Sequence, residues 1–211
     1  YRVRAKDGQY LWINNTGRAA EVDAAAKAVK LLGVHQNIDQ EKKIKEQLQY
    51  LSFHDDLTGL YNRRYFENEL ERLNHSRRYP VSIIAGDLDN LKIVNDTKGH
   101  KMGDKYIKRV AEIFQNVLRT EDIAARIGGD EIAVILPEAE REEAEIICSR
   151  IKEKCKKINN GENEFKELFR VSLGCYCLNQ SERDLNYAFQ KADEKMYENK
   201  QNYKNNSTRT Y

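Results

Sequence analysis

The 211-residue sequence contains no run of about 18 apolar residues, the length that a helix needs to cross a bilayer. Its first ten residues, YRVRAKDGQY, lack the basic and apolar regions of a secretory signal peptide. A charge imbalance is also absent, because 36 Lys and Arg stand against 34 Asp and Glu. We therefore expect a cytoplasmic protein with no membrane segment and no nucleic-acid binding through bulk charge, in which any anionic ligand is held by local cations.

Cysteine is scarce, and the P-loop motif G-x-x-x-x-G-K-[ST] is absent, which excludes a P-loop enzyme. Cys148 and Cys155 follow a helical spacing, and Cys175 and Cys177 follow a strand spacing. This pattern favours reduced core cysteines over metal or redox chemistry. We assign no function to them.

What the sequence does contain, 40% apolar and 33% charged residues, suffices for one good core and a smaller appended unit. Residues 1–38 alternate apolar and polar side chains around a turn at Asp7-Gly8, which predicts a short antiparallel meander. The pattern Y-R-x-x-x-x-D-G-x-x-x-W, followed by G-V-x-x-N-I at 33–38, resembles the C-terminal part of a PAS sensory domain. The alternative is a private sheet that packs on the main domain.

Residues 39–54 predict a charged helix with a narrow apolar stripe, Ile44, Leu48 and Leu51. Such a stripe suits a partner helix, and so a coiled-coil-like linker in a homodimer. One to two heptads also fit a helix that lies on its own domain, so both interpretations stay open.

Residues 55–206 alternate helices with apolar strands and include an antiparallel hairpin. This order predicts an α+β fold, a ferredoxin-like central sheet with packed helices. The expected helices are 62–78, 102–118, 141–158 and 185–201, and the expected strands are 81–87, 123–127, 132–137 and 169–178.

Two carboxylates stand at the ends of apolar strands. Gly128-Gly129 predicts a two-residue hairpin turn with positive φ at both glycines, and Asp130 follows that turn. Asp87 leaves the strand 81–87, so the two acids converge if their strands are neighbours. Two carboxylates without His or Cys favour a hard cation such as Mg²⁺, and hence phosphoryl chemistry. The alternative is a pair of solvated turn acids.

Three long motifs carry a resemblance over this whole region. DDLTGLYNRR at 55–64, DLDNLKIVNDTKGHKMGD at 87–104 and RIGGDEI at 126–132 are similar in order and spacing to the GGDEF family of diguanylate cyclases. The resemblance implies condensation of two GTP molecules into cyclic di-GMP with release of pyrophosphate. It also implies two Mg²⁺ or Mn²⁺ ions per active site and a homodimer in which each subunit holds one GTP.

The resemblance further implies roles for individual residues. These are metal ligation by Asp87, Asp130 and the backbone carbonyl of Leu88; catalysis by Asp130, with Glu131 as a supporting acid; guanine binding by Asn95 and Asp104; phosphate binding by Lys92, Lys200 and Lys204; and product inhibition by Arg119, Asp122 and Arg150. The alternatives are helix capping for the guanine pair, a solvated helix end for the C-terminal lysines and a surface ion pair for the Arg-x-x-Asp site.

The sequence departs from the family pattern at four positions. Ile132 and Leu91 stand in place of Phe, which keeps apolar bulk and predicts repacking without loss of the site. Tyr203 replaces a glycine, and Lys204 replaces an arginine in the closing motif, which predicts weaker phosphate binding.

Three functional hypotheses follow. The first is an active diguanylate cyclase that is regulated by its product and by an upstream PAS sensor. The second is a catalytically weak GGDEF domain that acts as a receptor for GTP or cyclic di-GMP. The third is a dimerisation module with an idle cyclase domain. Pyrophosphate release separates the first from the others, and nucleotide binding separates the second from the third.

Overall fold

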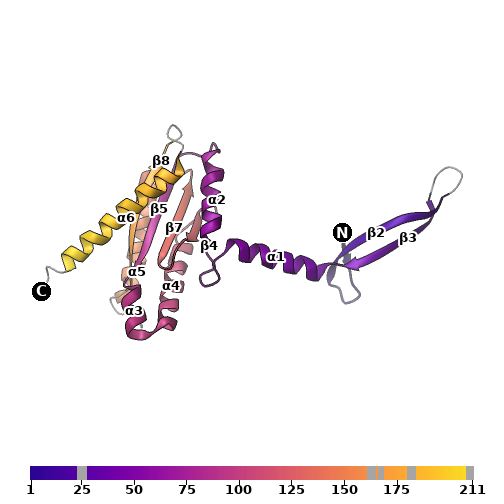
Figure 1. Cartoon of the computed structure of the whole chain (residues 1–211), viewed down its shortest axis with the longest axis horizontal. Coiled ribbons are helices and arrows are strands. Elements are labelled where there is room, and N and C mark those ends of the chain that lie inside the picture. Colours follow the sequence, from indigo (N-terminus) through magenta and orange to yellow (C-terminus); the bar gives the residue numbers. More distant parts are fainter. Residues whose placement is uncertain (23–27, 161–164, 166–168, 180–183, 208–211) are drawn as a thin grey trace. The chain divides into compact units, whose positions relative to one another are not determined.

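The computed structural model describes residues 1–22, 28–160, 165, 169–179 and 184–207, and it divides into two compact units, Tyr1–Ser52 and Phe53–Tyr211 (Figure 1). In the first unit, three antiparallel strands pair in the order β1-β2-β3. Their bounds are β1 (Arg2–Arg4), β2 (Tyr10–Val22) and β3 (Ala28–Asn37). Gly8 has a φ of 88° in the turn between β1 and β2. The predicted meander is therefore confirmed.

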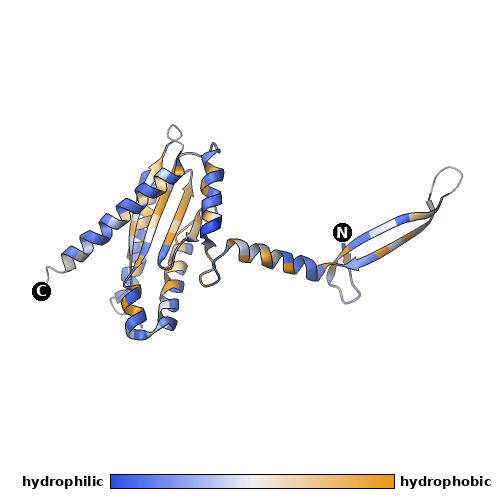
Figure 2. Ribbon diagram, in the orientation of Figure 1, coloured by the Kyte–Doolittle hydropathy of each residue, from blue (hydrophilic) through white to orange (hydrophobic). Residues whose placement is uncertain are grey.

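Helix α1 (Asp39–Phe53) follows the meander. The Trp12 N–H donates to the Asp39 carboxylate over 2.8 Å, and the Lys42 ammonium lies 3.8 Å from the centroid of the Trp12 ring. These contacts join the helix start to β2. Ile44, Leu48 and Leu51 are 49%, 62% and 54% exposed, and apolar positions recur along α1 in Figure 2. The apolar stripe is thus open to solvent in the single chain.

The second unit contains a five-stranded sheet in the order β4-β6-β7-β5-β8. Its strands are β4 (Tyr61–Asn62), β5 (Val81–Asp89), β6 (Ile123–Arg126), β7 (Glu131–Pro137) and β8 (Arg170–Leu178). Only the β4–β6 pair is parallel. Every residue of β5 is buried, because this strand lies between β7 and β8 and is covered on both faces. The ferredoxin-like arrangement is confirmed.

The helices of this unit are α2 (Arg63–Asn74), α3 (Leu91–Lys98), α4 (His100–Gln115), α5 (Arg141–Asn160) and α6 (Leu185–Ser207). Successive residues of β5 face opposite sides of the sheet. Ile84 packs with α4 and α5, whereas Ile83 packs with α2 and α6. The sequence periodicity missed β4 and α3, because two and eight residues are too short for a clear pattern. None of the helices in the described ranges combines the length and apolarity that membrane crossing requires.

Close packing at Gly174 fixes where α6 crosses the sheet. A Cβ atom at this position would collide with the backbone of α6 at Ala192 and Met196. Glycine therefore lets the helix backbone rest directly on β8. This contact brings the following turn of α6, which carries Lys200, over the end of β5.

All four cysteines are free thiols. Cys148 and Cys155 are buried on α5, while Cys175 and Cys177 on β8 are partly exposed. All four cysteines are therefore reduced, as expected, but only Cys148 and Cys155 are buried in the core.

Candidate active site

The loop between β6 and β7 differs from the predicted two-residue turn. The Ile127 N–H donates to the Glu131 carbonyl over 3.0 Å, so Gly128, Gly129 and Asp130 form the loop. Neither glycine has positive φ, and that prediction is wrong. A Cβ atom at Gly128 would instead collide with the side chain of Glu131. The first glycine thus leaves room for the Glu131 carboxylate, whereas the longer loop does not require left-handed backbone.

The end of β5 and this loop meet at one edge of the sheet. Asp87 is the register partner of Glu131, and the Leu88 N–H donates to the Asp130 carbonyl over 2.8 Å. Asp87 is buried, and Asp130 is partly exposed. The two strands are neighbours, which is the condition under which the acids were expected to converge. The structure thus brings Asp87, Asp130 and Glu131 together.

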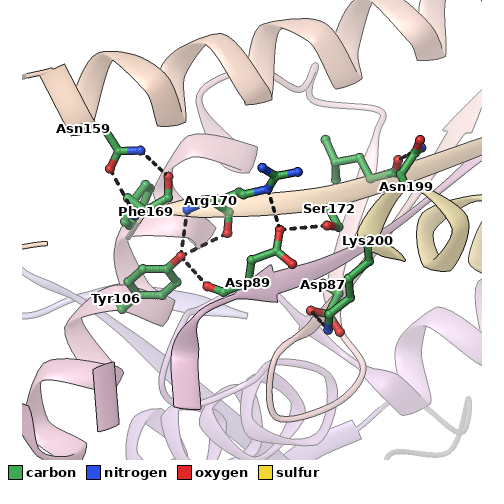
Figure 3. Close-up of polar contacts among 10 residues, drawn as sticks. Asp87, Asp89, Tyr106, Asn159, Phe169, Arg170, Ser172, Asn199 and Lys200 are labelled. Atoms are coloured by element: carbon green, nitrogen blue, oxygen red, sulfur yellow. Dashed lines mark hydrogen bonds and ion pairs between the residues drawn. The ribbon is translucent and has the colours of Figure 1, made fainter. Parts of the chain in front are cut away.

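This cluster concentrates negative charge around a single ammonium group. The Lys200 Nζ donates to the Asp87 Oδ1 over 2.5 Å, across 113 positions of sequence (Figure 3). Burial raises the pKa of Asp87, and the charges of Asp130 and Asp89 add to this effect and outweigh the opposing contact with Lys200. Burial and the charge of Asp130 likewise raise the pKa of Glu131. Burial lowers the pKa of Lys200, but its contact with Asp87 prevails and raises it.

A hard divalent cation fits this arrangement, because the donors are carboxylate and backbone oxygens and the acids repel one another without a cation. Asp87, Asp130 and the carbonyl of Leu88 would be its ligands. Within the described ranges, no group of three or more His, Cys, Asp or Glu side chains is placed to bind a metal. A site here therefore depends on the backbone carbonyl and on oxygen atoms of the substrate or water.

Asp89, two residues beyond Asp87, is a buried group that sequence reasoning did not single out. Its carboxylate accepts hydrogen bonds from Ser172 Oγ at 2.7 Å and Arg170 Nε at 3.1 Å. The Tyr106 hydroxyl donates to the Asp89 carbonyl over 2.8 Å and accepts from the Arg170 N–H over 2.8 Å (Figure 3). These bonds fix the end of β5 against β8. The sequence did contain a signal for Asp89. In a strand, Asp87 and Asp89 stand two positions apart and therefore lie on the same face of the sheet.

The predicted guanine pair lies at the junction of α3 and α4. The Asn95 side chain packs on Gly103, where a Cβ atom would collide with its Oδ1, and Asp104 follows on the exposed side of α4. Gly99, with a φ of 80°, makes the turn between the helices. The capping alternative is wrong for both residues, because Asn95 lies within α3 and Asp104 within α4, which begins earlier than expected.

The predicted phosphate lysines occupy different surroundings. Lys92 is exposed in the first turn of α3, and Lys200 is bound to Asp87. Lys204 belongs to α6, but its side chain lies outside the described residues. Of the two lysine side chains that are described, Lys200 contacts the acids and Lys92 does not.

The Arg119-Asp122 pair forms a turn before β6. The Asp122 carboxylate accepts from the Arg119 backbone N–H over 2.8 Å, while the guanidinium pairs with Glu143 at 3.0 Å. Glu143 was missed, because it lies 24 positions away on α5. Arg150 is exposed farther along this helix. In the single chain, Arg119 thus takes part in a surface ion pair, but its partner is Glu143 and not Asp122. Because the pair is exposed, it contributes little to stability.

Arg126 anchors the Gly-Gly-Asp loop to the turn that begins the second unit. Its guanidinium donates to both carboxylate oxygens of Asp55 at 3.3 and 3.2 Å and to the Gly129 carbonyl at 2.8 Å. Asp55 also accepts two hydrogen bonds from Thr58. Burial raises the pKa of Asp55, but the bonds from Thr58 and Arg126 prevail and lower it below 3.8.

We expect Arg126→Lys to destabilise the protein by about 1–3 kcal/mol, because one ammonium cannot replace the two-sided guanidinium contact. The lowered pKa of Asp55 means that its contribution is present above pH 3.8 and is lost as the pH falls below that value. The difference between wild type and variant should therefore shrink between pH 7 and pH 3 in urea denaturation. Arg63→Lys, in an exposed pair with Glu67, is the control and should change nothing measurable. A constant difference at both pH values would contradict this assignment.

Comparison with known proteins places these features in a family context. The family model described as "Diguanylate cyclase, GGDEF domain" matches residues 52–206. The probable diguanylate cyclase DgcT of Escherichia coli is 33% identical over 158 residues, covering 74% of this chain and 35% of the relative. A diguanylate cyclase of Vibrio cholerae is 29% identical over 186 residues, covering 85% and 56%. The chain thus spans about a third and just over half of the length of these two relatives.

Solved structures give the same result. The coiled coil and GGDEF domain of DgcB from Caulobacter crescentus, in complex with c-di-GMP, matches with a TM-score of 0.68 at 25% identity and covers 78% of this chain and 89% of that chain. The GGDEF domain of the same protein with c-di-GMP matches with a TM-score of 0.62 at 26% identity, covering 71% and 91%.

Proposed function

The chain belongs to the GGDEF family of diguanylate cyclase domains, and from this membership we propose that it condenses two GTP molecules into cyclic di-GMP and releases pyrophosphate. The observation that carries the proposal is the contact of Lys200 with Asp87 beside Asp130. Phosphoryl transfer requires a cation near the phosphates and acids that can hold a metal ion. Lys200, Asp87 and Asp130 would supply both at one edge of the sheet.

Asp87, Asp130 and the Leu88 carbonyl would hold two Mg²⁺ or Mn²⁺ ions, with Glu131 in support. When bound, such ions lower the pKa of the attacking 3′-hydroxyl and neutralise charge on the α-phosphate. Lys92, Lys200 and Lys204 would bind and orient the phosphate chain. A family that generally uses a divalent metal, and an oxygen-only donor set, support this assignment.

The organisation of the chain is part of the proposal. Residues 1–38 would be the C-terminal part of a PAS sensor, 39–54 a coiled-coil-like linker and 55–206 the cyclase domain, acting in the cytoplasm. The meander and the exposed apolar stripe of α1 support this division. Because each subunit would hold one GTP, the active form would be a homodimer.

Incubation of the purified protein with GTP and Mg²⁺ tests the activity, with pyrophosphate and cyclic di-GMP measured together. We expect both products in a 2:1 ratio, since each of two bond-forming steps releases one pyrophosphate. Binding of GTP or cyclic di-GMP without either product would favour the receptor hypothesis. The lysine at position 204, where the family motif has arginine, is consistent with that hypothesis because it predicts weaker phosphate binding. Absence of both binding and turnover would overturn the proposal.

Asp104 would accept hydrogen bonds from N1–H and the 2-amino group of guanine, a donor pair that adenine lacks. We expect Asp104→Ser to lower the GTP-over-ATP preference in kcat/KM by at least about tenfold, because a hydroxyl serves either base. Competition between the two nucleotides measures this ratio. Asp184→Asn, at the other end of the unit, is the control. An unchanged ratio would show that Asp104 does not bind the base.

Arg119, Asp122 and Arg150 would bind cyclic di-GMP as an inhibitor. We expect Arg119→Ala to weaken inhibition by at least about tenfold and to leave the initial rate unchanged, because a guanidinium that binds guanine by stacking and hydrogen bonds is lost. Glu143→Gln is the matched variant, since it frees the arginine from its ion pair and should strengthen inhibition. Equal inhibition of all three proteins would reduce Arg119 to a surface pair.

A further inference from the structure

A cavity of about 360 Å³ lies between α5, the start of β8 and the end of α6, and none of the predicted guanine or product residues lines it. Its walls include Lys152, Lys156, Arg170 and Tyr203. Among the described residues, the lining holds three cations and no carboxylate. The volume lies within the roughly 300–1,000 Å³ range of small-molecule sites.

The two lysines form one wall. Lys152 and Lys156 are exposed and four residues apart on α5, so their side chains share a face of the helix. Neither forms a salt bridge with a described residue, whereas Lys157 on the same helix pairs with Glu153 at 2.9 Å. Two ammonium groups thus point at one cavity with their charge uncompensated by the described part of the chain, which favours an anion.

Arg170 forms the opposite wall and is held in place. Its Nε donates to Asp89, and its guanidinium carbon lies 3.0 Å from the centroid of the Tyr203 ring. The side chain is 30% exposed, and its two terminal nitrogens have no hydrogen-bond partner among the described residues (Figure 3). A fixed guanidinium with free donors is the group best suited to bind phosphate with two hydrogen bonds.

The cavity is linked to the proposed catalytic acids through Asp89, which binds a residue of the cavity wall. Asp87 and Asp89 lie on one face of β5; the first binds Lys200 and the second binds Arg170. Tyr203 follows Lys200 by one turn of α6. Each of these two acids therefore binds one cation, Lys200 at the proposed active site and Arg170 in the cavity wall.

We propose that this cavity is a second phosphate-binding site, which takes inorganic pyrophosphate or the phosphate chain of a nucleotide through Lys152, Lys156 and Arg170. The identity of the ligand rests on the proposed function, because pyrophosphate is the product released beside it. The binding itself does not depend on turnover. Tyr203, which occupies a position where the family motif has glycine, then orients Arg170 through the contact of its ring with the guanidinium.

Calorimetric titration of the full chain with inorganic pyrophosphate, with EDTA present, tests the site. We expect the variant Lys152→Ala/Lys156→Ala to bind pyrophosphate at least about tenfold more weakly than wild type, because one or more charge-assisted hydrogen bonds are lost. Lys154→Ala/Lys157→Ala removes the same charge from the same helix outside the cavity and should bind as wild type. Arg170→Lys should also weaken binding, since charge is kept but the fork is lost.

A parallel titration with GTP identifies the source of the phosphate. Loss of affinity for pyrophosphate alone supports a product site, and loss for both ligands supports a site for the nucleotide chain. Equal pyrophosphate affinity in wild type and in both double-lysine variants would overturn the inference. Pyrophosphate binding without any turnover of GTP would instead overturn the proposed function and leave this site standing.

Discussion

Asp87→Asn and Asp130→Asn are each expected to lower GTP turnover about 10³-fold or more, which corresponds to about 4 kcal/mol of transition-state stabilisation. Each change replaces a charged oxygen ligand by a neutral amide of the same shape, so the affinity for a hard cation falls. Release of pyrophosphate at saturating GTP and Mg²⁺ measures the effect. Wild-type rates in either variant would remove these acids from the mechanism.

Stability separates this loss of ligand from a loss of fold. The amide of Asp87→Asn keeps the shape of the side chain, and its oxygen can still accept the hydrogen bond from Lys200, so the thermal midpoint should change little. Asp7→Asn, whose carboxylate accepts from the Gln9 backbone N–H in the turn between β1 and β2, is the matched control and should keep full activity. A large drop in thermal midpoint for Asp87→Asn would mean that the acid has a structural role.

Leu48→Lys/Leu51→Lys is expected to abolish most activity at dilute protein and to restore part of it at high concentration. These side chains are 62% and 54% exposed in the single chain, and burying them between two α1 helices would hold two GTP molecules face to face. Specific activity across a dilution series, together with sedimentation, measures the effect. Nucleotide binding per subunit should stay intact.

Gln49→Lys adds a charge to α1 at a position that lies about 100° or more around the helix from each of Ile44, Leu48 and Leu51, and serves as the control. It should follow the wild-type dilution curve. If the stripe variant also follows that curve and sediments as wild type does, the stripe does not set the dimer, and the account of signal transfer through α1 is wrong.

Much of the chain could be predicted because the signals are local. The fully apolar run of β5, the alternation of the N-terminal meander and the helical spacing around α4 and α5 each reflect which side chains must leave water. The motifs also gave the order of Asp87, Asn95, Asp104 and Asp130 along the chain. The missed elements, β4 and α3, are too short for such a pattern.

Loop conformation and long-range pairing were not accessible in this way. The glycine pair suggested a tight two-residue turn, but the Ile127 N–H pairs with the Glu131 carbonyl, and neither glycine in the longer loop has positive φ. The sequence spacing suggested Asp122 as the partner of Arg119, whereas the Arg119 guanidinium forms its ion pair with Glu143 on α5. Asp122 and Glu143 both offer a carboxylate and differ only in where the fold places them relative to Arg119. Sequence spacing does not report this placement.

The sequence by itself determined the family, the sheet-and-helix pattern and the identity of the acids at the strand ends, because burial and motif spacing act over short stretches. Tertiary structure decided which groups meet those acids. Gly174 lets α6 rest on β8, and this packing helps to carry Lys200 across 113 positions to Asp87 and to set Tyr203 over Arg170. Charge attraction selects a partner only after the backbone has brought it within a few ångströms, and that approach is a property of the folded core.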